Sequence, residues 1–196
     1  MSHVHEASAN SSNRVKSLVA ALEAAHVLTE RDLDAAVESF LINAQPANGA
    51  RIVARAWVDN DFRTRLLADA NAAVAELGID LAHWAPVKLR AVANEPLQHN
   101  LIVCTLCSCY PLALLGPSPS WYKSESYRSR AVRDPRGVLA EFGTQLSDDV
   151  EITVWDSTAE VRYMVLPMRP AGTEDASEAQ LAALVTRNAL IGTALV

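Results

Sequence analysis

The N-terminal part of the chain repeats apolar residues at steps of three and four, the spacing of an amphipathic helix. The clearest run is Val15, Leu18, Val19 and Leu22. Together with the many alanines around it, this pattern predicts a helical N-terminal region over residues 13–80. Residues 1–12 are rich in Ser, His, Asn and Ala, and for them we expect a disordered tail.

Capping signals divide the helical region into separate helices. Thr29 stands before Glu-Arg-Asp, as an N-cap residue does, and Gly78 follows Leu77 as a residue beyond a helix C-terminus does. The expected helices run from Thr29 through Phe40, over residues 48–58, and from Asp59 or Asn60 through Leu67.

Beyond Pro86 the pattern changes to the two-residue alternation that is typical of β-strands. Strands are expected over residues 87–92, 99–103, 150–155 and 162–167. Helices are expected over residues 122–132, 135–142 and 177–186, with Pro135 in a favourable first-turn position. A helical first part followed by a mixed second part, residues 81–196, predicts the α+β class.

Length and charge limit the kinds of partner. The 196 residues suffice for one compact domain with a sizeable core and an N-terminal extension, and the net charge of −6 argues against nucleic acid as a partner. No run approaches the roughly 18 apolar residues of a membrane span, and no apolar signal segment opens the chain. We therefore expect a cytoplasmic protein with no membrane partner.

One local cluster departs from the acidic balance. It consists of Lys123, Arg128, Arg130, Arg133 and Arg136. At helical spacing, such a cluster is typical of a solvated helix face, of a surface that meets an acidic partner, or of positive charge near an anionic metal site. The sequence leaves these three interpretations open.

All three cysteines of the chain fall in one short segment, at positions 104, 107 and 109. From a helix or a strand, this spacing cannot turn three side chains toward one core. In a loop the same spacing lets three sulfurs converge on one point, and a soft metal ion is the natural occupant of that point. The segment therefore predicts a metal-binding loop.

Three other interpretations of the cysteines are weaker. A disulfide with one spare thiol is disfavoured, because disulfides are typical of secreted proteins with an even number of cysteines, and this sequence shows neither a secretion signal nor an even number. A structural zinc site needs a fourth ligand, either His99 or a residue from elsewhere. An iron–sulfur cluster is typically held by four cysteines, one more than the chain contains.

The backbone between Cys107 and Cys109 offers further donors. With both sulfurs bound to a metal, the amide nitrogens of Ser108 and Cys109 lie beside it in small chelate rings, and a trivalent ion can displace their protons. Three sulfurs and two nitrogens leave a sixth octahedral position open. An open position is characteristic of a catalytic metal rather than a structural one.

The segment Val103-Cys104-Thr105-Leu106-Cys107-Ser108-Cys109-Tyr110-Pro111 resembles the metal-binding loop of the α subunit of nitrile hydratase. Other matching segments, in the same order along the chain, are residues 46–57, 75–79, Asn94, His99-Asn100, Trp121-Tyr122-Lys123-Ser124, Tyr127-Arg128-Ser129-Arg130, Pro135-Arg136, 141–143, 162–167 and 169–173. The γ subunit of thiocyanate hydrolase shares the architecture and the loop.

The resemblance implies a layered α/β domain after the helical arm, and hydration of a nitrile to its amide at a low-spin, non-corrin Co(III), one per subunit. Fe(III) is the alternative, but Thr105 and Tyr110 follow the cobalt-type pattern. The implied ligands are Cys104, Cys107, Ser108 and Cys109. Cys107 would be a cysteine sulfinic acid and Cys109 a cysteine sulfenic acid, with Cys104 a thiolate.

The resemblance also implies roles and partners. The sulfenate oxygen of Cys109 would act as a base or as the attacking nucleophile, and Arg162 would support the site from behind the ligands, a surface ion pair being its alternative. A β-type subunit of one or two chains would contribute two arginines and form a heterodimer or a higher αβ oligomer. A metallochaperone or activator would insert cobalt. The apolar faces of the N-terminal helices would suit a helical arm that wraps around a partner subunit.

Departures from the family pattern bear on the substrate pocket, where the resemblance places Tyr110 and Leu112. Leu112 replaces a tryptophan that usually forms a pocket wall. Residues 83–86 replace a stretch that contains Gly and Gln, and residues 116–120 replace a Leu-Pro-Pro run. These changes favour a bulky aromatic or heterocyclic nitrile, or thiocyanate, over a small aliphatic nitrile.

Two rival functions remain open. A thiocyanate hydrolase-type subunit would use the same metal centre on thiocyanate. A non-catalytic metal-carrying protein would bind metal reversibly, keep its cysteines unoxidised and show no turnover with any partner.

Overall fold

The computed structural model describes residues 2–79, 81 and 87–196, and the chain divides into two compact units, Met1–Asn43 and Ala44–Val196. The strands of the described chain and the three cysteines belong to the second unit. Among the described helices, none combines the length and the apolar character needed to cross a membrane.

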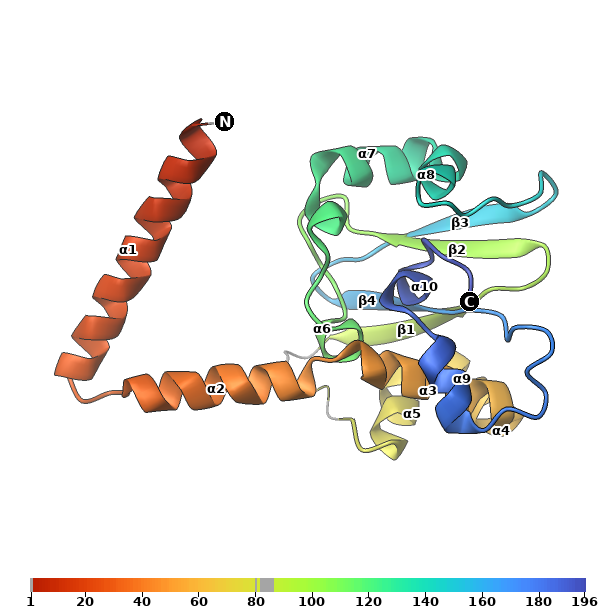
Figure 1. Cartoon of the computed structure of the whole chain (residues 1–196), viewed down its shortest axis with the longest axis horizontal. Helices are drawn as coiled ribbons and strands as arrows, with labels where there is room; N and C mark the ends of the chain where they lie inside the picture. The colour runs from red at the N-terminus through yellow and green to blue at the C-terminus, as the bar shows by residue number, and fades with distance from the viewer. Residues whose placement is uncertain (1, 80, 82–86) are drawn as a thin grey trace. The chain divides into compact units, whose positions relative to one another are not determined.

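The first unit consists of two helices, α1 (Ser2–Ala24) and α2 (Glu30–Asn43) (Figure 1). Helix α1 begins at Ser2, which differs from the disordered tail expected over residues 1–12; that stretch contains no glycine or proline to interrupt a helix. Helix α2 begins as expected. The Thr29 hydroxyl accepts a hydrogen bond from the Asp32 amide at 3.2 Å, and Asp32 Oδ2 accepts one from the Thr29 amide at 2.8 Å.

This first unit buries little apolar surface. None of the residues of α2 is buried. Among the side chains of the unit whose burial is described, residues 10–43, the large apolar ones that remain exposed are Val15, Leu18, Val27, Val37, Phe40, Leu41 and Ile42. An exposed set of this size is typical of a surface that another chain covers.

The second unit opens with three helices, α3 (Pro46–Val58), α4 (Asn60–Ala68) and α5 (Ala70–Glu76). A single aspartate separates each from the next. Asp59 accepts a hydrogen bond from the Phe62 amide and Asp69 accepts one from the Ala72 amide, so each caps the following helix. The predictions for α3 and α4 are confirmed, and Gly78 has the left-handed conformation expected just after the last helix, with φ of 73°.

The four expected strands are confirmed, each boundary within one residue. They are β1 (Lys88–Ala93), β2 (Gln98–Val103), β3 (Glu151–Asp156) and β4 (Val161–Leu166). Strand β1 pairs in parallel with β4, and β2 pairs in parallel with β3. The two pairs adjoin through contacts between β2 and β4 (Figure 1).

Short helices cover both pairs. They are α6 (Leu112–Leu115), the 3-10 helix η2 (Ser120–Lys123), α7 (Glu125–Arg133), α8 (Pro135–Glu141), α9 (Glu178–Leu184) and α10 (Arg187–Ile191). Helix α7 contacts β2, α8 contacts β3, and α4 and α5 contact β1. The helix expected over residues 122–132 is divided at Ser124, whose hydroxyl caps α7, and Pro135 stands in the first turn of α8 as predicted. This architecture confirms the α+β class.

A buried polar network lies at the start of β2. His99 Nε2 is 2.7 Å from the Gly192 carbonyl oxygen, so Nε2 carries the proton and Nδ1 accepts from the Asn94 amide at 3.2 Å. Asn100 donates to the Ala93 carbonyl at 2.7 Å and accepts from the Trp155 indole at 2.8 Å. The network therefore ties β2 to the end of β1, to β3 and to the C-terminal segment.

Candidate metal centre

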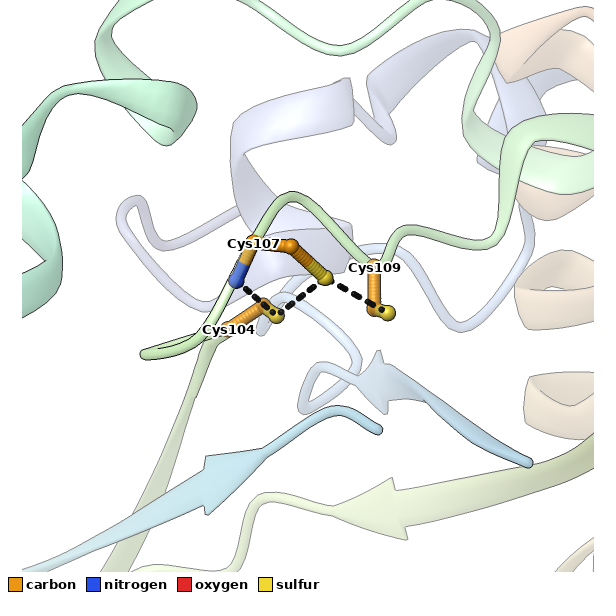
Figure 2. A group of neighbouring side chains, drawn as sticks. All are labelled: Cys104, Cys107 and Cys109. Atoms are coloured by element: carbon orange, nitrogen blue, oxygen red, sulfur yellow. Dashed lines mark hydrogen bonds between the residues drawn. The ribbon is translucent and has the colours of Figure 1, made fainter. Parts of the chain in front are cut away.

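The three cysteines lie in an irregular segment between the end of β2 and the start of α6. The Sγ atoms of Cys104 and Cys107 are 3.6 Å apart, those of Cys107 and Cys109 are 3.2 Å apart, and all three lie within 4.8 Å of one another. The Cys107 amide also donates to Cys104 Sγ at 3.3 Å (Figure 2). The predicted convergence of three sulfurs is confirmed.

The loop is buried at its start and open at its tip. Cys104 is buried, Cys109 is half-buried and Cys107 is exposed. Leu106, at the tip, is 84% exposed. Small molecules and ions therefore reach the sulfurs from the side of Cys107.

The parallel pairing of β2 with β3 supplies the first anchor of the loop. Val103 and Asp156 end the two strands side by side, which places the Asp156 carboxylate next to the residue after Cys104. Asp156 accepts hydrogen bonds from the Thr105 amide at 2.9 Å and from the Thr105 hydroxyl at 2.5 Å. One side chain thus holds the backbone and the side chain of the same loop residue.

Two buried tyrosines supply further anchors. The Tyr122 hydroxyl donates to the Cys109 carbonyl at 3.0 Å, and the Tyr127 hydroxyl donates to the Ile102 carbonyl at 2.6 Å. Burial raises the pKa of both hydroxyls well above its ordinary value, so both remain protonated donors. Both rings pack edge-to-face against Trp121, and the Tyr127 ring also packs edge-to-face against Phe142, which fixes the hydroxyl positions.

Helix α7 provides the last anchor. Arg128 Nη1 donates to the carbonyl oxygens of Thr105 and Cys107, at 3.4 and 3.3 Å. The two N–H groups of one nitrogen thus serve both oxygens. Of the three interpretations of the basic cluster, Arg128 thus follows the one in which positive charge lies at the loop.

The other cationic side chains of that cluster have different surroundings. Arg130 pairs with Glu141 and Asp134 of the same chain, and Arg136 donates to the carbonyls of Leu146, Ser147 and Val150. Lys123 and Arg133 are exposed.

The two outer thiols have different acidities. Hydrogen bonds from Cys109, from Cys104 and from the Ser108 amide lower the pKa of Cys107 to about 7. Burial and the neighbouring Cys107 raise the pKa of Cys109 to about 12, although the charge of Arg162 opposes the rise. The first proton of this coupled pair is therefore lost at Cys107, the most exposed of the three sulfurs.

This donor set fits a single soft ion. Two sulfurs at right angles around an ion, with metal–sulfur bonds of about 2.3 Å, lie about 3.3 Å apart. The Cys107–Cys109 separation of 3.2 Å is close to that value. The Ser108 and Cys109 amides also act as hydrogen-bond donors toward the Cys107 sulfur, which places both nitrogens near that sulfur.

The predicted pocket residues share one cavity. Tyr110, Leu112 and Arg162 line a space of about 110 Å³, whose remaining walls are Leu81, Val87, Leu89, Pro111, Ala113 and Leu114. Burial raises the pKa of Tyr110, and its hydroxyl has no hydrogen-bond partner among the residues that the structure describes. The pocket roles of Tyr110 and Leu112 and the supporting role of Arg162 stay predictions. The segment 83–86 lies outside the described residues.

His99 is excluded as a fourth ligand of the loop. Both ring nitrogens take part in the polar network at the opposite end of β2. All three cysteines are free thiols, so the interpretation with a disulfide is wrong for this structure as well.

Sequence reasoning missed the anchors Asp156, Tyr122 and Tyr127, and it placed Arg128 near the metal only as one of three alternatives. Three of these four side chains bond to backbone carbonyls, and such contacts leave no spacing pattern in a sequence. For Asp156 a signal existed, because it directly follows the strand predicted over residues 150–155, but the strand partner was not predicted.

Comparison with known proteins agrees with this geometry. The family model described as "Nitrile hydratase, alpha chain" matches residues 9–194. The chain is 51% identical over 179 residues to the low-molecular weight cobalt-containing nitrile hydratase subunit alpha of Rhodococcus rhodochrous, covering 91% of this chain and 86% of the relative. It is 45% identical over 159 residues to the thiocyanate hydrolase subunit gamma of Thiobacillus thioparus, covering 76% of this chain and 65% of the relative.

Solved structures give the same result. A double mutant of the Fe-type nitrile hydratase from Comamonas testosteroni Ni1 superposes with a TM-score of 0.88 at 41% identity, over 95% of this chain and 90% of that chain.

Proposed function

Because the chain belongs to the nitrile hydratase alpha-chain family, we propose that it is the metal-bearing α subunit of a cobalt nitrile hydratase. The enzyme adds water to R–C≡N and gives R–CONH2. The observation that carries the proposal is the convergence of three free thiols within 4.8 Å in the loop of a member of this family.

The metal centre would be formed by one short segment of this chain. The sulfurs of Cys104, Cys107 and Cys109 and the amide nitrogens of Ser108 and Cys109 would hold one Co(III) per chain. Cobalt is favoured over Fe(III) by Thr105 and Tyr110, and the relatives from Rhodococcus rhodochrous and Pseudonocardia thermophila are named as cobalt-containing. When bound, such an ion supplies Lewis acidity at its open position.

The burial of the sulfurs supports different oxidation states for them. Cys107 is exposed and has the lowered pKa of a reactive thiol, which favours oxidation to the sulfinic acid. Cys109 is half-buried beside it and would stop at the sulfenic acid, whereas the buried Cys104 would stay a thiolate. The sulfenate oxygen of Cys109 would take a proton from water or attack the nitrile carbon.

Arg162 and the cavity beside the loop would position the substrate. The charge of Arg162 acts on Cys109 and would stabilise the anionic oxidised sulfur. Leu112 is a smaller wall than tryptophan, and the apolar lining of the cavity suits an aromatic or heterocyclic nitrile. Accordingly, Leu112→Trp should shift preference toward smaller nitriles; an unchanged order of kcat/KM across a nitrile series would contradict this pocket assignment.

A β-type subunit of one or two chains would complete the enzyme as a heterodimer or a higher oligomer. Exposed apolar side chains on α1 and α2 offer it a surface, and the exposed tip of the cysteine loop is open to cations from it. An activator or metallochaperone would deliver cobalt to the loop.

Thiocyanate hydrolysis is the second candidate. The identity to the thiocyanate hydrolase γ subunit and the departure at Leu112 favour it. Both activities would use the same loop, so only the substrate separates them.

The test is to produce the chain with its β-type partner in cobalt-supplemented cells, and to measure metal, mass and products. One cobalt per chain, three added oxygens on the loop peptide and amide formed from a nitrile are expected. Consumption of thiocyanate without amide formation would identify the second candidate. Unoxidised thiols and no turnover in the complete complex would leave a metal-carrying protein and end the enzyme proposal.

A further inference from the structure

The peptide that joins Cys107 to Ser108 is held from one side only. Its carbonyl oxygen, which belongs to Cys107, accepts from Arg128 Nη1 at 3.3 Å. Its amide nitrogen, which belongs to Ser108, acts as a hydrogen-bond donor toward the Cys107 sulfur. No cis peptide bond occurs in the described chain, so the two groups of this planar trans unit point in opposite directions. Whatever fixes the oxygen outward also fixes the nitrogen inward.

The other anchors act on different peptides. Asp156 binds the amide and hydroxyl of Thr105, which lies three residues before Ser108. Tyr122 binds the carbonyl of Cys109, which belongs to the peptide after the Cys109 nitrogen. Apart from the Cys107 sulfur itself, Arg128 is the only described side chain whose hydrogen bonds reach the Cys107–Ser108 peptide.

The surroundings of Arg128 direct its guanidinium toward the loop. The neighbouring Tyr127 is buried and bonded to Ile102, which fixes this turn of α7 against β2. Arg128 is half-buried, and its Nε is enclosed without a hydrogen-bond partner among the described residues. Its hydrogen-bonding capacity is therefore concentrated at the end of the side chain that meets the loop.

We propose that Arg128 is a positioning residue that holds the Cys107 carbonyl outward and thereby turns the Ser108 amide nitrogen toward the metal position. This role deepens the proposed function, since it rests on Ser108 being a ligand. A second hydrogen bond, from Arg128 Nη1 to the Thr105 carbonyl oxygen, makes Arg128 a brace across the loop between Thr105 and Cys107. A planar, permanently charged guanidinium suits this task because it reaches two oxygens at once.

The test compares variants of the complete complex produced in cobalt-supplemented cells. Arg128→Met removes the donors and keeps most of the aliphatic chain, and Arg128→Lys keeps one charged donor group. Arg133→Met is the matched control, because Arg133 ends the same helix and is exposed. Cobalt per chain under chelator challenge, the sulfur-to-cobalt absorption band and the melting temperature are measured for each.

Arg128→Met should weaken cobalt retention by roughly 10- to 100-fold, the range for residues that orient metal ligands. Any cobalt it does retain should show a displaced absorption band, because one nitrogen donor is missing. Arg128→Lys should recover part of the retention and shift the band back, while Arg133→Met should match the wild type. A purely structural role would lower the melting temperature without displacing the band.

Full retention with an unchanged band in Arg128→Met would overturn the role of Arg128. If Arg128→Met fails to fold, Arg128→Lys decides instead. A lysine variant with the cobalt retention and the absorption band of the fully loaded wild type would count against positioning by two bonds. A wild type that holds cobalt without hydrating nitriles would remove the proposed function but not this inference. A wild type unable to hold cobalt would overturn both.

Discussion

The two ends of β2 are built in opposite ways. At its start, His99 and Asn100 are buried and bonded to Asn94, Ala93, Gly192 and Trp155. At its end, three thiols converge and bond mainly to one another, with Cys107 in solvent. The same strand thus has a closed end, at His99 and Asn100, whose polar groups are bonded inside the protein. It also has an open end, at the cysteine loop, whose donors remain available. The bonded polar groups of the first end stabilise the fold, and only the second end has donor atoms available to bind a ligand.

The largest effect should come from removing the central donor. Cys107→Ala leaves two sulfurs, one of them buried, and should abolish stable cobalt binding in the complex. Metal analysis after dialysis measures this. Because the side chain is exposed, the melting temperature of the metal-free chain should change little. Retained cobalt would mean that the centre does not depend on Cys107.

A substitution that strains the backbone beside the closed end should destabilise the protein. Gly192 has φ of 90°, and a Cβ there would lie 2.0 Å from the Asn100 carbonyl oxygen. Gly192→Ala should therefore lower the free energy of unfolding by roughly 3 kcal/mol, from left-handed strain and from displacement of the network.

Gly143→Ala is the control for that substitution. Gly143 has φ of 83° but nothing within 4 Å of a built Cβ, so only strain of about 1 kcal/mol is expected. Denaturant unfolding measures both variants. Equal losses would show that the contact with Asn100 is unimportant.

The closed end should lose stability as the pH falls, whereas the thiols of the open end should become more reactive as the pH rises. Burial lowers the pKa of His99 below its ordinary value of 6.5, although the Gly192 carbonyl opposes the shift. The unfolded chain then binds the proton more tightly, so stability should fall as pH drops below about 6.5 toward the folded pKa. Denaturant midpoints between pH 7.5 and about 5 in wild type and His99→Gln check this. Identical slopes in the two proteins would assign the acid sensitivity to other groups.

The smallest effect is a difference in thiol reactivity at the open end. In the metal-free chain, alkylation of Cys107 should be half-maximal near a pH of about 7, where its thiolate forms. Cys104, buried, and Cys109, with its raised pKa, should react more slowly. Peptide mass spectrometry after brief exposure to iodoacetamide gives the order, and preferential labelling of Cys104 would contradict it.

The open end of β2 was more predictable from the sequence than the closed end. The spacing of Cys104, Cys107 and Cys109 restricts where three sulfurs can meet, and local alternation identified all four strands. Pairing β2 with β3 in parallel joins segments some fifty residues apart, for which local pattern carries no information. The network of His99 was missed for the same reason, since Gly192 lies 93 residues away from it.

The short helices α6 and α10 were missed because they have four and five residues, too few to show a helical period. The resemblance supplied what local pattern did not, namely the expected identity of the metal and the expected β-type partner. Those assignments concern a bound ion and a partner chain, and neither is expressed in the hydrophobic pattern of this chain.

The bond from Asp156 to Thr105 joins residues that are 51 positions apart. During synthesis the cysteines therefore leave the ribosome well before the carboxylate that shapes their loop has been made. Until β3 has docked beside β2, the loop lacks the anchor that Asp156 provides. We therefore expect selective capture of a metal to follow the completion of β3 rather than the appearance of the cysteines.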